Sequence, residues 1–230
     1  MIATLDSFRH MLEDLGNGLG LTDPWRDVAS PSGWGLELVG DATLRAVARN
    51  EVLDGAFRRR VESALGDLPY ELGVQIDLAA FAEAGEYIGF QGEYMRLFDI
   101  GAVRPPCPLY GGEWGGGTRK RSMEEAVRFY RFFGMKIDQS AHELPDHITV
   151  ELEFLQVMAF TEGMTRVRGA DPAALLRAQR DFIERHPGRW WPMLERKLPA
   201  ESPSPFYAAL AALTGAVLAA DREYMRHQLV

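Results

Sequence analysis

The chain has 230 residues, of which 47% are hydrophobic, and a formal net charge of −8. This length and composition can bury a full core, and we expect residues 1–230 to form one domain. The negative charge disfavours a nucleic-acid partner and favours a basic or apolar peptide. One cysteine, Cys107, excludes an internal disulfide framework. Without a signal peptide or an apolar run that could span a bilayer, the sequence predicts a soluble cytoplasmic protein.

The N-terminal part predicts helices separated by a long loop. An amphipathic segment forms a first short helix that ends near Gly16, with its apolar face made by Leu5, Phe8, Leu12 and Leu15. Residues 16–40 are rich in Gly, Pro and Ser and predict a loop. Asp41 is the expected cap of a second helix, which runs to about residue 65 and meets a C-terminal cap at Gly66. Residues 74–98 predict a less regular helical region.

Residues 99–121 hold three prolines and six glycines, a content that excludes a helix or a central strand. A long ordered loop in a compact domain is often functional. Ser122 and Glu125 have the spacing of a capping box and predict a helix that Gly134 closes.

The segment ELPDHITVELEFLQVMAF, residues 143–160, predicts the most buried helix of the chain. Pro145 fits the first helical position, and Asp146 fits a cap or the first turn. Apolar residues on nearly every face require burial of most of its circumference. These are Ile148, Val150, Leu152, Phe154, Leu155, Val157, Met158 and Ala159.

Two start signals define the C-terminal helices. Asp171-Pro172 opens a helix that stops at residues 186–188, and Ser204-Pro205 opens the last one. Residues 189–198, with Trp190 and Trp191 as anchors, predict one or two helical turns. No run of alternating strands is present, so the predicted fold class is all-α.

An ionisable cluster surrounds the start of the 143–160 helix. His147 and Glu151 are four residues apart, a spacing that could hold a metal. The metalloprotease pattern fails because His142 and His147 are five apart across a proline. Capping acids with a bonded histidine are the simpler interpretation, and a small helical metal-dependent hydrolase using His142, Asp146, His147 and Glu151 stays as an alternative.

The glycine-rich residues 111–122 lead into a helix and carry Arg119, Lys120 and Arg121. A helix N-terminus with basic residues can bind phosphate, yet Gly117 is followed by Thr118 and Arg119 and not by lysine and then serine or threonine, as a phosphate-binding loop requires. A surface loop is favoured, with a regulator that binds guanine nucleotide as the alternative. Cys107 has no histidine near it in sequence and is expected to be inert.

Four segments together resemble a known family. EYMRLF (residues 93–98), PPCPLY (105–110), ELPDHITVELEFL (143–155) and FIERHPGRWWPML (182–194) occur in this order. The set resembles the TorD/DmsD/NarJ family of redox-enzyme maturation chaperones, and its overall character resembles the subgroup that serves type II enzymes of the dimethyl sulfoxide reductase family. One departure is Gly-Gly-Glu-Trp after Tyr110, where an acidic residue and a serine are expected.

The resemblance implies an all-helical cytoplasmic chaperone without catalytic activity or cofactor of its own. Such a protein binds the twin-arginine signal peptide and the apo form of a molybdoenzyme catalytic subunit. It delays export until the molybdopterin guanine dinucleotide cofactor is inserted. The resemblance also leaves room for a weak contact with a guanine nucleotide or with that cofactor. It implies no transmembrane segment.

The resemblance also implies a peptide-binding region, which a basic and apolar leader would enter through an apolar groove with an acidic rim. Its expected residues are Leu97, Phe98, Pro145, Asp146, His147 and Glu151, with Glu143 on the rim and loop contacts from Tyr110, Trp114 and Arg119. Neighbouring helical residues point about 100° apart, so we expect Phe98 to be buried and Leu97 to be partly exposed in the groove.

Overall fold

The computed structural model describes residues 56–66, 68, 70–82, 87–99, 104–115, 118–137 and 144–230. Predictions for the first helix, the loop 16–40, the Asp41 cap, His142 and Glu143 lie outside these residues. The described elements are α4 (Ala56–Gly66), η2 (Leu78–Ala82), α5 (Tyr87–Phe98), η3 (Gly111–Glu113), α6 (Arg119–Phe132), α7 (Ile148–Val167), α8 (Ala173–Arg185), α9 (Pro187–Lys197), η4 (Leu198–Glu201) and α10 (Pro205–Gln228).

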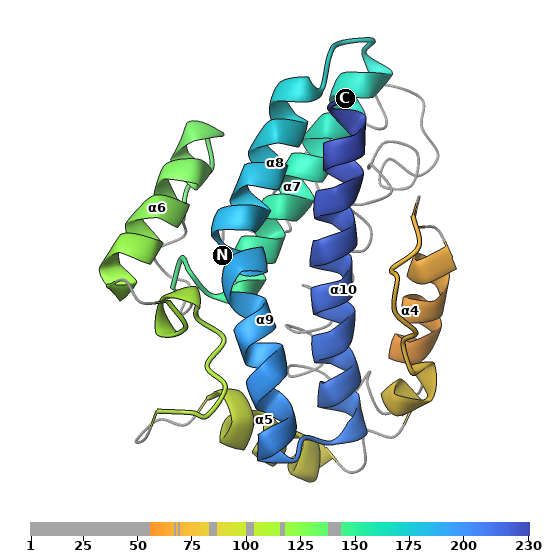
Figure 1. Ribbon diagram of the computed structural model, residues 1–230, viewed down its shortest axis with the longest axis vertical. Helices are drawn as coiled ribbons and strands as arrows, with labels where there is room; N and C mark the ends of the chain where they lie inside the picture. Colours follow the sequence, from red (N-terminus) through yellow and green to blue (C-terminus); the bar gives the residue numbers. More distant parts are fainter. Residues whose placement is uncertain are drawn as a thin grey trace.

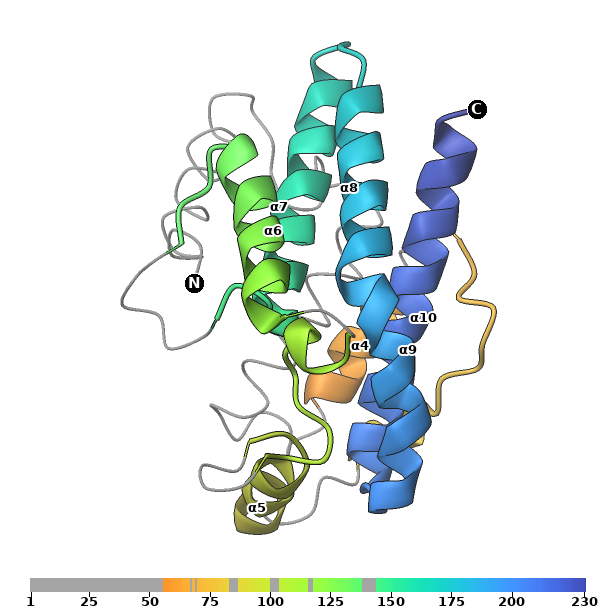
Figure 2. The same cartoon turned by 60° about the vertical axis from the view of Figure 1, so that its left-hand side comes forward.

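The described part of the chain is helical, as predicted, and has isolated bridge residues, such as the pair Tyr110 and His147, but no strand. Helices α7, α8 and α10 lie side by side, α9 continues below α8 along α10, and α6 and α4 flank this layer (Figure 1). The described residues between α5 and α6 rise from α5 towards the lower ends of α6 and α7 (Figure 2). No helix in the described ranges is long and apolar enough to cross a membrane.

Helix α7 is the central element, as the sequence predicts. Of its 20 residues, 15 are buried, so nearly the whole circumference faces other parts of the protein. Phe154 of α7 lies 4.4 Å from Phe182 of α8, measured between ring centroids. Tyr130 of α6 packs on both rings. Edge and tilted aromatic contacts of this kind add to the energy of apolar burial.

The start of α7 is three residues later than predicted, because Pro145 and Asp146 form a turn before the helix. Their carbonyl groups bond to other segments: Pro145 O accepts from the Tyr130 hydroxyl at 2.7 Å, and Asp146 O accepts from Gly111 N at 2.8 Å. His147 takes the capping position, where its Nδ1 accepts a bond from Thr149 N. Tertiary contacts therefore override the proline signal.

Helix α6 also differs from its prediction at one end. It begins at Arg119 with Thr118 as its N-cap, so the capping box at Ser122 and Glu125 is wrong and both residues lie inside the helix. The C-terminal prediction is confirmed. Gly134 has φ +75°, and Met135 N bonds back to Tyr130 O, which is the geometry of a glycine-terminated helix.

The C-terminal starts are confirmed. Asp171 Oδ1 accepts from Ala173 N at 2.9 Å before α8, although Pro172, predicted in the first turn, is the N-cap, and Ser204 is the N-cap of α10. Helix α9 has 11 residues and is longer than the predicted one or two turns. Gly66 is the last residue of α4. Trp190 and Trp191 are both buried, which agrees with their role as anchors.

Candidate functional site

Residues 104–115, called the strap from here on, lie between the end of α5, the start of α7 and α9. At one end, Cys107 N donates to Leu97 O at 3.0 Å, which attaches the strap to α5. The Lys197 ammonium of α9 donates to Pro106 O. The strap is therefore an ordered connection held by two helices that are about 100 residues apart in sequence.

A second set of bonds attaches the strap to the start of α7. Ile148 N donates to Leu109 O at 2.9 Å, and Gly111 N donates to Asp146 O at 2.8 Å. Gly112 N donates to the Asp146 side chain, at 2.9 Å from Oδ2. These bonds place the strap directly over the residues that precede and begin α7.

Side chains on the strap reinforce this contact. The Tyr110 and His147 rings pack edge to face with centroids 4.8 Å apart, and the same two residues form the isolated bridge. The Arg119 guanidinium lies 4.6 Å from the centre of the Tyr110 ring and 3.1 Å from Glu113 Oε1. Cation–π and ionic contacts thus link the strap to the start of α6. The indole of Trp114 donates to Pro108 O at 2.7 Å, within the strap.

The Asp146 carboxyl is fully buried, so it does not form the solvent-facing acidic rim that the sequence predicts. Burial raises its pKa above the usual value, and the Gly112 N–H bond and the Arg119 charge oppose that rise. Its Oδ1 has no hydrogen-bond partner in the described parts of the chain. Asp146 therefore acts from inside the protein as the anchor of the strap.

Glu151 is also fully buried, in the first turn of α7. Burial raises the pKa of its carboxyl well above the usual range, and the Trp190 N–H bond, at 3.0 Å from Oε2, opposes this rise. His186 Nδ1 lies 3.8 Å from Oε1, and burial lowers the pKa of His186 to about 4. Burial thus favours the uncharged form of each group and disfavours an ion pair between them.

Trp190 joins this buried carboxyl to the strap. A Cβ atom at Gly111 would lie 2.8 Å from Trp190 Nε1 and 2.9 Å from Cδ1, so only glycine allows the indole to approach this closely. The sequence predicts Trp190 as an anchor and does not indicate this contact with Gly111. The adjacent glycines and the tryptophan are visible in the sequence, but their contact depends on the turn between α8 and α9.

The expectation that Leu97 is partly exposed is wrong: its exposed fraction is 0%, and that of Phe98 is 7%. Phe98 packs between Tyr94 and Tyr207, at ring distances of 5.5 and 5.4 Å, as its predicted inward face requires. Leu97 is buried because the strap covers the α5 terminus at Cys107. Neither side chain faces an open groove in this state.

A metal site is absent from the described residues, where no cluster of three or more histidine, cysteine and acidic side chains has suitable geometry. His147 uses Nδ1 in capping α7, and Glu151 bonds to Trp190. Cys107 is buried, and burial raises the pKa of its thiol, which makes it a poor nucleophile at neutral pH.

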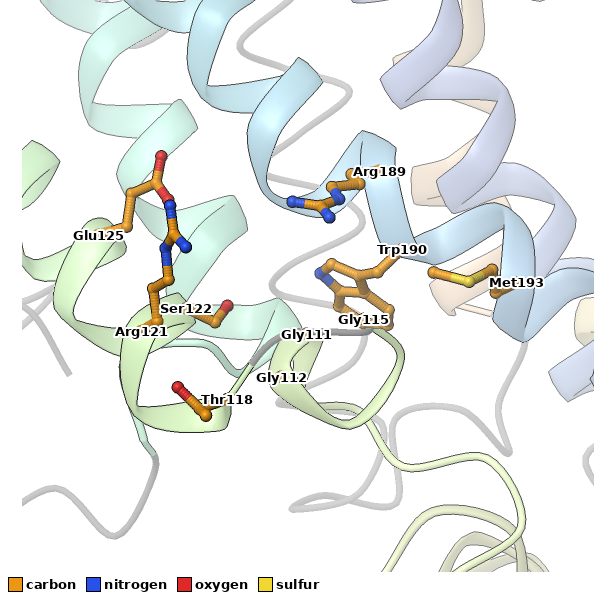
Figure 3. Close-up of a pocket in the computed structure, with 10 residues that line it drawn as sticks. All are labelled: Gly111, Gly112, Gly115, Thr118, Arg121, Ser122, Glu125, Arg189, Trp190 and Met193. Carbon is orange, nitrogen blue, oxygen red and sulfur yellow. The ribbon is translucent and has the colours of Figure 1, made fainter.

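An open pocket of about 230 Å³ lies beside the strap, between the start of α6 and the start of α9 (Figure 3). Arg121 and Arg189 supply positive charge, and Glu125 supplies one carboxylate, which pairs with Arg185 of α8. The indole of Trp190 forms one wall. The full lining is Gly111, Gly112, Gly115, Thr118, Arg121, Ser122, Glu125, Arg189, Trp190 and Met193.

The family named Nitrate reductase delta subunit matches residues 68–196, which is more than half of the chain. The chain belongs to this family. The match spans α5, the strap and the helices from α6 to nearly the end of α9, so it includes the strap and the start of α7.

Individual relatives agree with the family. The selenate reductase assembly chaperone protein of Thauera selenatis is 32% identical over 60% of this chain and 71% of its own length. The perchlorate reductase assembly chaperone protein of Dechloromonas aromatica is 31% identical over 61% of this chain and 63% of its own. Chaperone protein TorD of Vibrio parahaemolyticus is 28% identical over 79% of each chain.

These comparisons confirm the resemblance to the TorD/DmsD/NarJ family and to the subgroup for type II enzymes of the dimethyl sulfoxide reductase family. Family members are molybdoenzyme assembly chaperones, so the chain is a chaperone and not an enzyme. The hydrolase alternative is therefore wrong.

Proposed function

We propose that the chain binds the twin-arginine leader and the apo catalytic subunit of one molybdopterin oxidoreductase in the cytoplasm, and delays export of that subunit until its cofactor is inserted. The observation that supports this proposal best is the similarity to assembly chaperones named for selenate and perchlorate reductases. The client is accordingly a type II enzyme of the dimethyl sulfoxide reductase family.

The peptide-binding region that we propose contains Leu97, Phe98, Pro145, Asp146, His147 and Glu151. All of these side chains are buried except Pro145, which is half-buried. Tyr110, Trp114 and Arg119 lie on or beside the strap and are half-buried, so they are the first of these residues that a peptide can meet. Contact then begins at the strap and extends to the start of α7.

Calorimetric titration with a synthetic leader from a candidate client tests this function. We expect the Arg-Arg leader to bind and a Lys-Lys version to bind more weakly, because arginine makes bidentate bonds that lysine cannot make. Copurification with the apo subunit, and not with the cofactor-loaded subunit, is the second expected result. Failure of both leader and apo subunit to bind would exclude the proposed function.

A weak contact with an anionic nucleotide is a second candidate function, and the pocket beside the strap favours it. Two arginines, two hydroxyl groups and the first turns of α6 and α9 face this space. Phosphate binds well at such helix N-termini. With about 230 Å³, the pocket is smaller than the roughly 300–1,000 Å³ of common ligand sites.

The pocket is therefore suited to a phosphate group or one ring and not to a whole dinucleotide cofactor. Titration with GMP, inorganic phosphate and guanosine separates these ligand parts. Binding of GMP and phosphate without guanosine would support the phosphate contact, and no binding of any of the three would remove it.

A further inference from the structure

The strap covers the residues that the proposed function assigns to the peptide. Its backbone reaches the Leu97 carbonyl through Cys107, and it reaches Asp146 through Gly111 and Gly112. A leader cannot touch these buried groups while the strap keeps this position. Either they never meet the leader, or the strap moves.

The strap is attached at separate points and not along one continuous ladder. Pro105, Pro106 and Pro108 have no N–H group, so a quarter of its 12 residues cannot donate a backbone bond. The bonds that attach it to the helices below are divided among the end of α5, the start of α7 and Lys197, an exposed lysine of α9. Because no helix contains the strap, it can open without unfolding these helices.

Opening would uncover a surface with the chemistry of a leader receptor. Leu97 is apolar and is bonded to the strap through its carbonyl, and the Asp146 carboxyl would lose its bond from Gly112 N and become free to accept an arginine. An apolar patch with one adjacent carboxylate complements a segment that is basic at one end and apolar in the middle.

We propose that the strap is a gate: the leader binds the state in which residues 104–115 are lifted from α5 and α7, and the closed state described above excludes it. This inference rests on the proposed function, because it names the leader as the ligand of the open state. The closed state then lowers the apparent affinity by the fraction of molecules that are open.

The native thiol offers a direct measure of opening. Cys107 is the one cysteine in the chain, lies on the strap, and has an exposed fraction of 0%. A thiol reagent can reach it only when the strap opens, so its labelling rate reports the open fraction. The full-length protein can be used without any added probe.

Gly112→Ala should shift the strap towards its open state. The new Cβ would lie 2.8 Å from the Arg119 Cα and 2.8 Å from Asp146 Oδ2, and the backbone atom cannot move aside. Gly112 has no positive φ, so alanine brings no other strain. Lys197→Met removes a tether at the surface and is the second variant in case Gly112→Ala fails to fold. Gly66→Ala on α4 is the control, because its Cβ would meet nothing within 4 Å.

We expect Gly112→Ala to raise the Cys107 labelling rate and the leader affinity by a common factor of roughly ten, since both scale with the open fraction. Lys197→Met should raise both by a smaller common factor, and Gly66→Ala should change neither. Circular dichroism and thermal melts confirm that each variant is folded.

Faster labelling without tighter leader binding would overturn the gate, and so would unchanged labelling in both folded variants. In those cases wild-type protein that still binds the leader leaves the proposed function intact. A wild-type protein that binds neither leader nor apo subunit would overturn the function and the gate together.

Discussion

The two sides of the strap show opposite uses of charge. On the inner side, Asp146 and Glu151 are fully buried, and their ionised forms are disfavoured. On the outer side, Arg121, Glu125 and Arg189 line an open pocket. The inner groups therefore hold the structure together, whereas Arg121 and Arg189 on the outer side face a space that a ligand can enter.

This difference separates two meanings of a charged residue near a helix start. A buried carboxyl is retained at an energetic cost and stabilises only through the specific bonds that it accepts. An exposed arginine contributes little to stability and much to ligand binding. Substitutions on the two sides should therefore affect different measurements.

The largest effect that we expect on the inner side is from Leu97→Ala, which tests whether this residue is core. Removing a fully buried leucine should lower the free energy of unfolding by about 2–5 kcal/mol through lost burial and a cavity. Met95→Ala on the same helix is the control, since Met95 is 43% exposed and should change stability by at most about 0.5 kcal/mol. Equal denaturation midpoints for the two variants would show that Leu97 is accessible after all.

A smaller loss is expected from Trp190→Phe. The phenyl ring keeps most of the packing but leaves Glu151 without its N–H donor, at a cost of about 1–3 kcal/mol. Combining it with Glu151→Leu provides the control, because replacing both partners by apolar groups should cost less than the two single changes added together. Strict additivity in urea denaturation would show that the bond contributes nothing.

The sequence located these residues but did not reveal which were buried. Helix periodicity predicted the burial of α7 and the inward face of Phe98, because both depend on local spacing. The starts of α7 and α6 were misplaced since backbone bonds from distant segments compete with local capping. Burial of Leu97 and Asp146 depends on the strap, whose path a sequence rich in proline and glycine does not determine.

The role of Trp190 was missed for a related reason. Its indole approaches Gly111 and Glu151, residues that are 79 and 39 positions away, and no periodic pattern connects these distances. The turn at His186, where α8 ends and α9 begins, brings the tryptophan to the strap. Long-range geometry of this kind becomes visible only in the folded chain.

The pH dependence of stability in the Glu151→Gln variant tests whether the inner carboxyl is buried in its uncharged form. Glu151 has a raised pKa in the folded state, so between its unfolded value of about 4.5 and that raised value only the folded state holds the proton. The contribution of Glu151 to the free energy of unfolding therefore falls as pH rises above about 4.5, by at most about 1.4 kcal/mol per pH unit. Glutamine still accepts from Trp190 and has no proton to lose.

The unfolding free energies of Glu151→Gln and wild type should thus be similar near pH 4. As pH increases to 8, the variant should become more stable than wild type. His186 has the opposite sign, because its pKa is lowered to about 4 and its contribution is lost as pH falls below about 6.5. The loss of stability that His186 causes at acid pH should be easier to measure in Glu151→Gln, because the opposing contribution of Glu151 is absent. A constant difference between the two proteins from pH 4 to 8 would contradict the burial of an uncharged carboxyl.

The smallest effect on stability is expected on the outer side, from Arg189→Gln in the pocket. Arg189 is exposed at the start of α9, and its replacement should change the free energy of unfolding by at most about 0.5 kcal/mol. The same change should weaken GMP binding roughly tenfold or more, since a hydrogen bond to a charged group contributes about 1.5–3 kcal/mol.

Arg177→Gln, an exposed position on α8, is the charge-matched control. Repeating the titration at higher salt should reduce the difference between Arg189→Gln and wild type, because ions screen an open site. Equal GMP affinity for Arg189→Gln and Arg177→Gln at low salt would show that the pocket does not use its arginine, and the contrast between the two sides of the strap would then rest on the buried carboxyls alone.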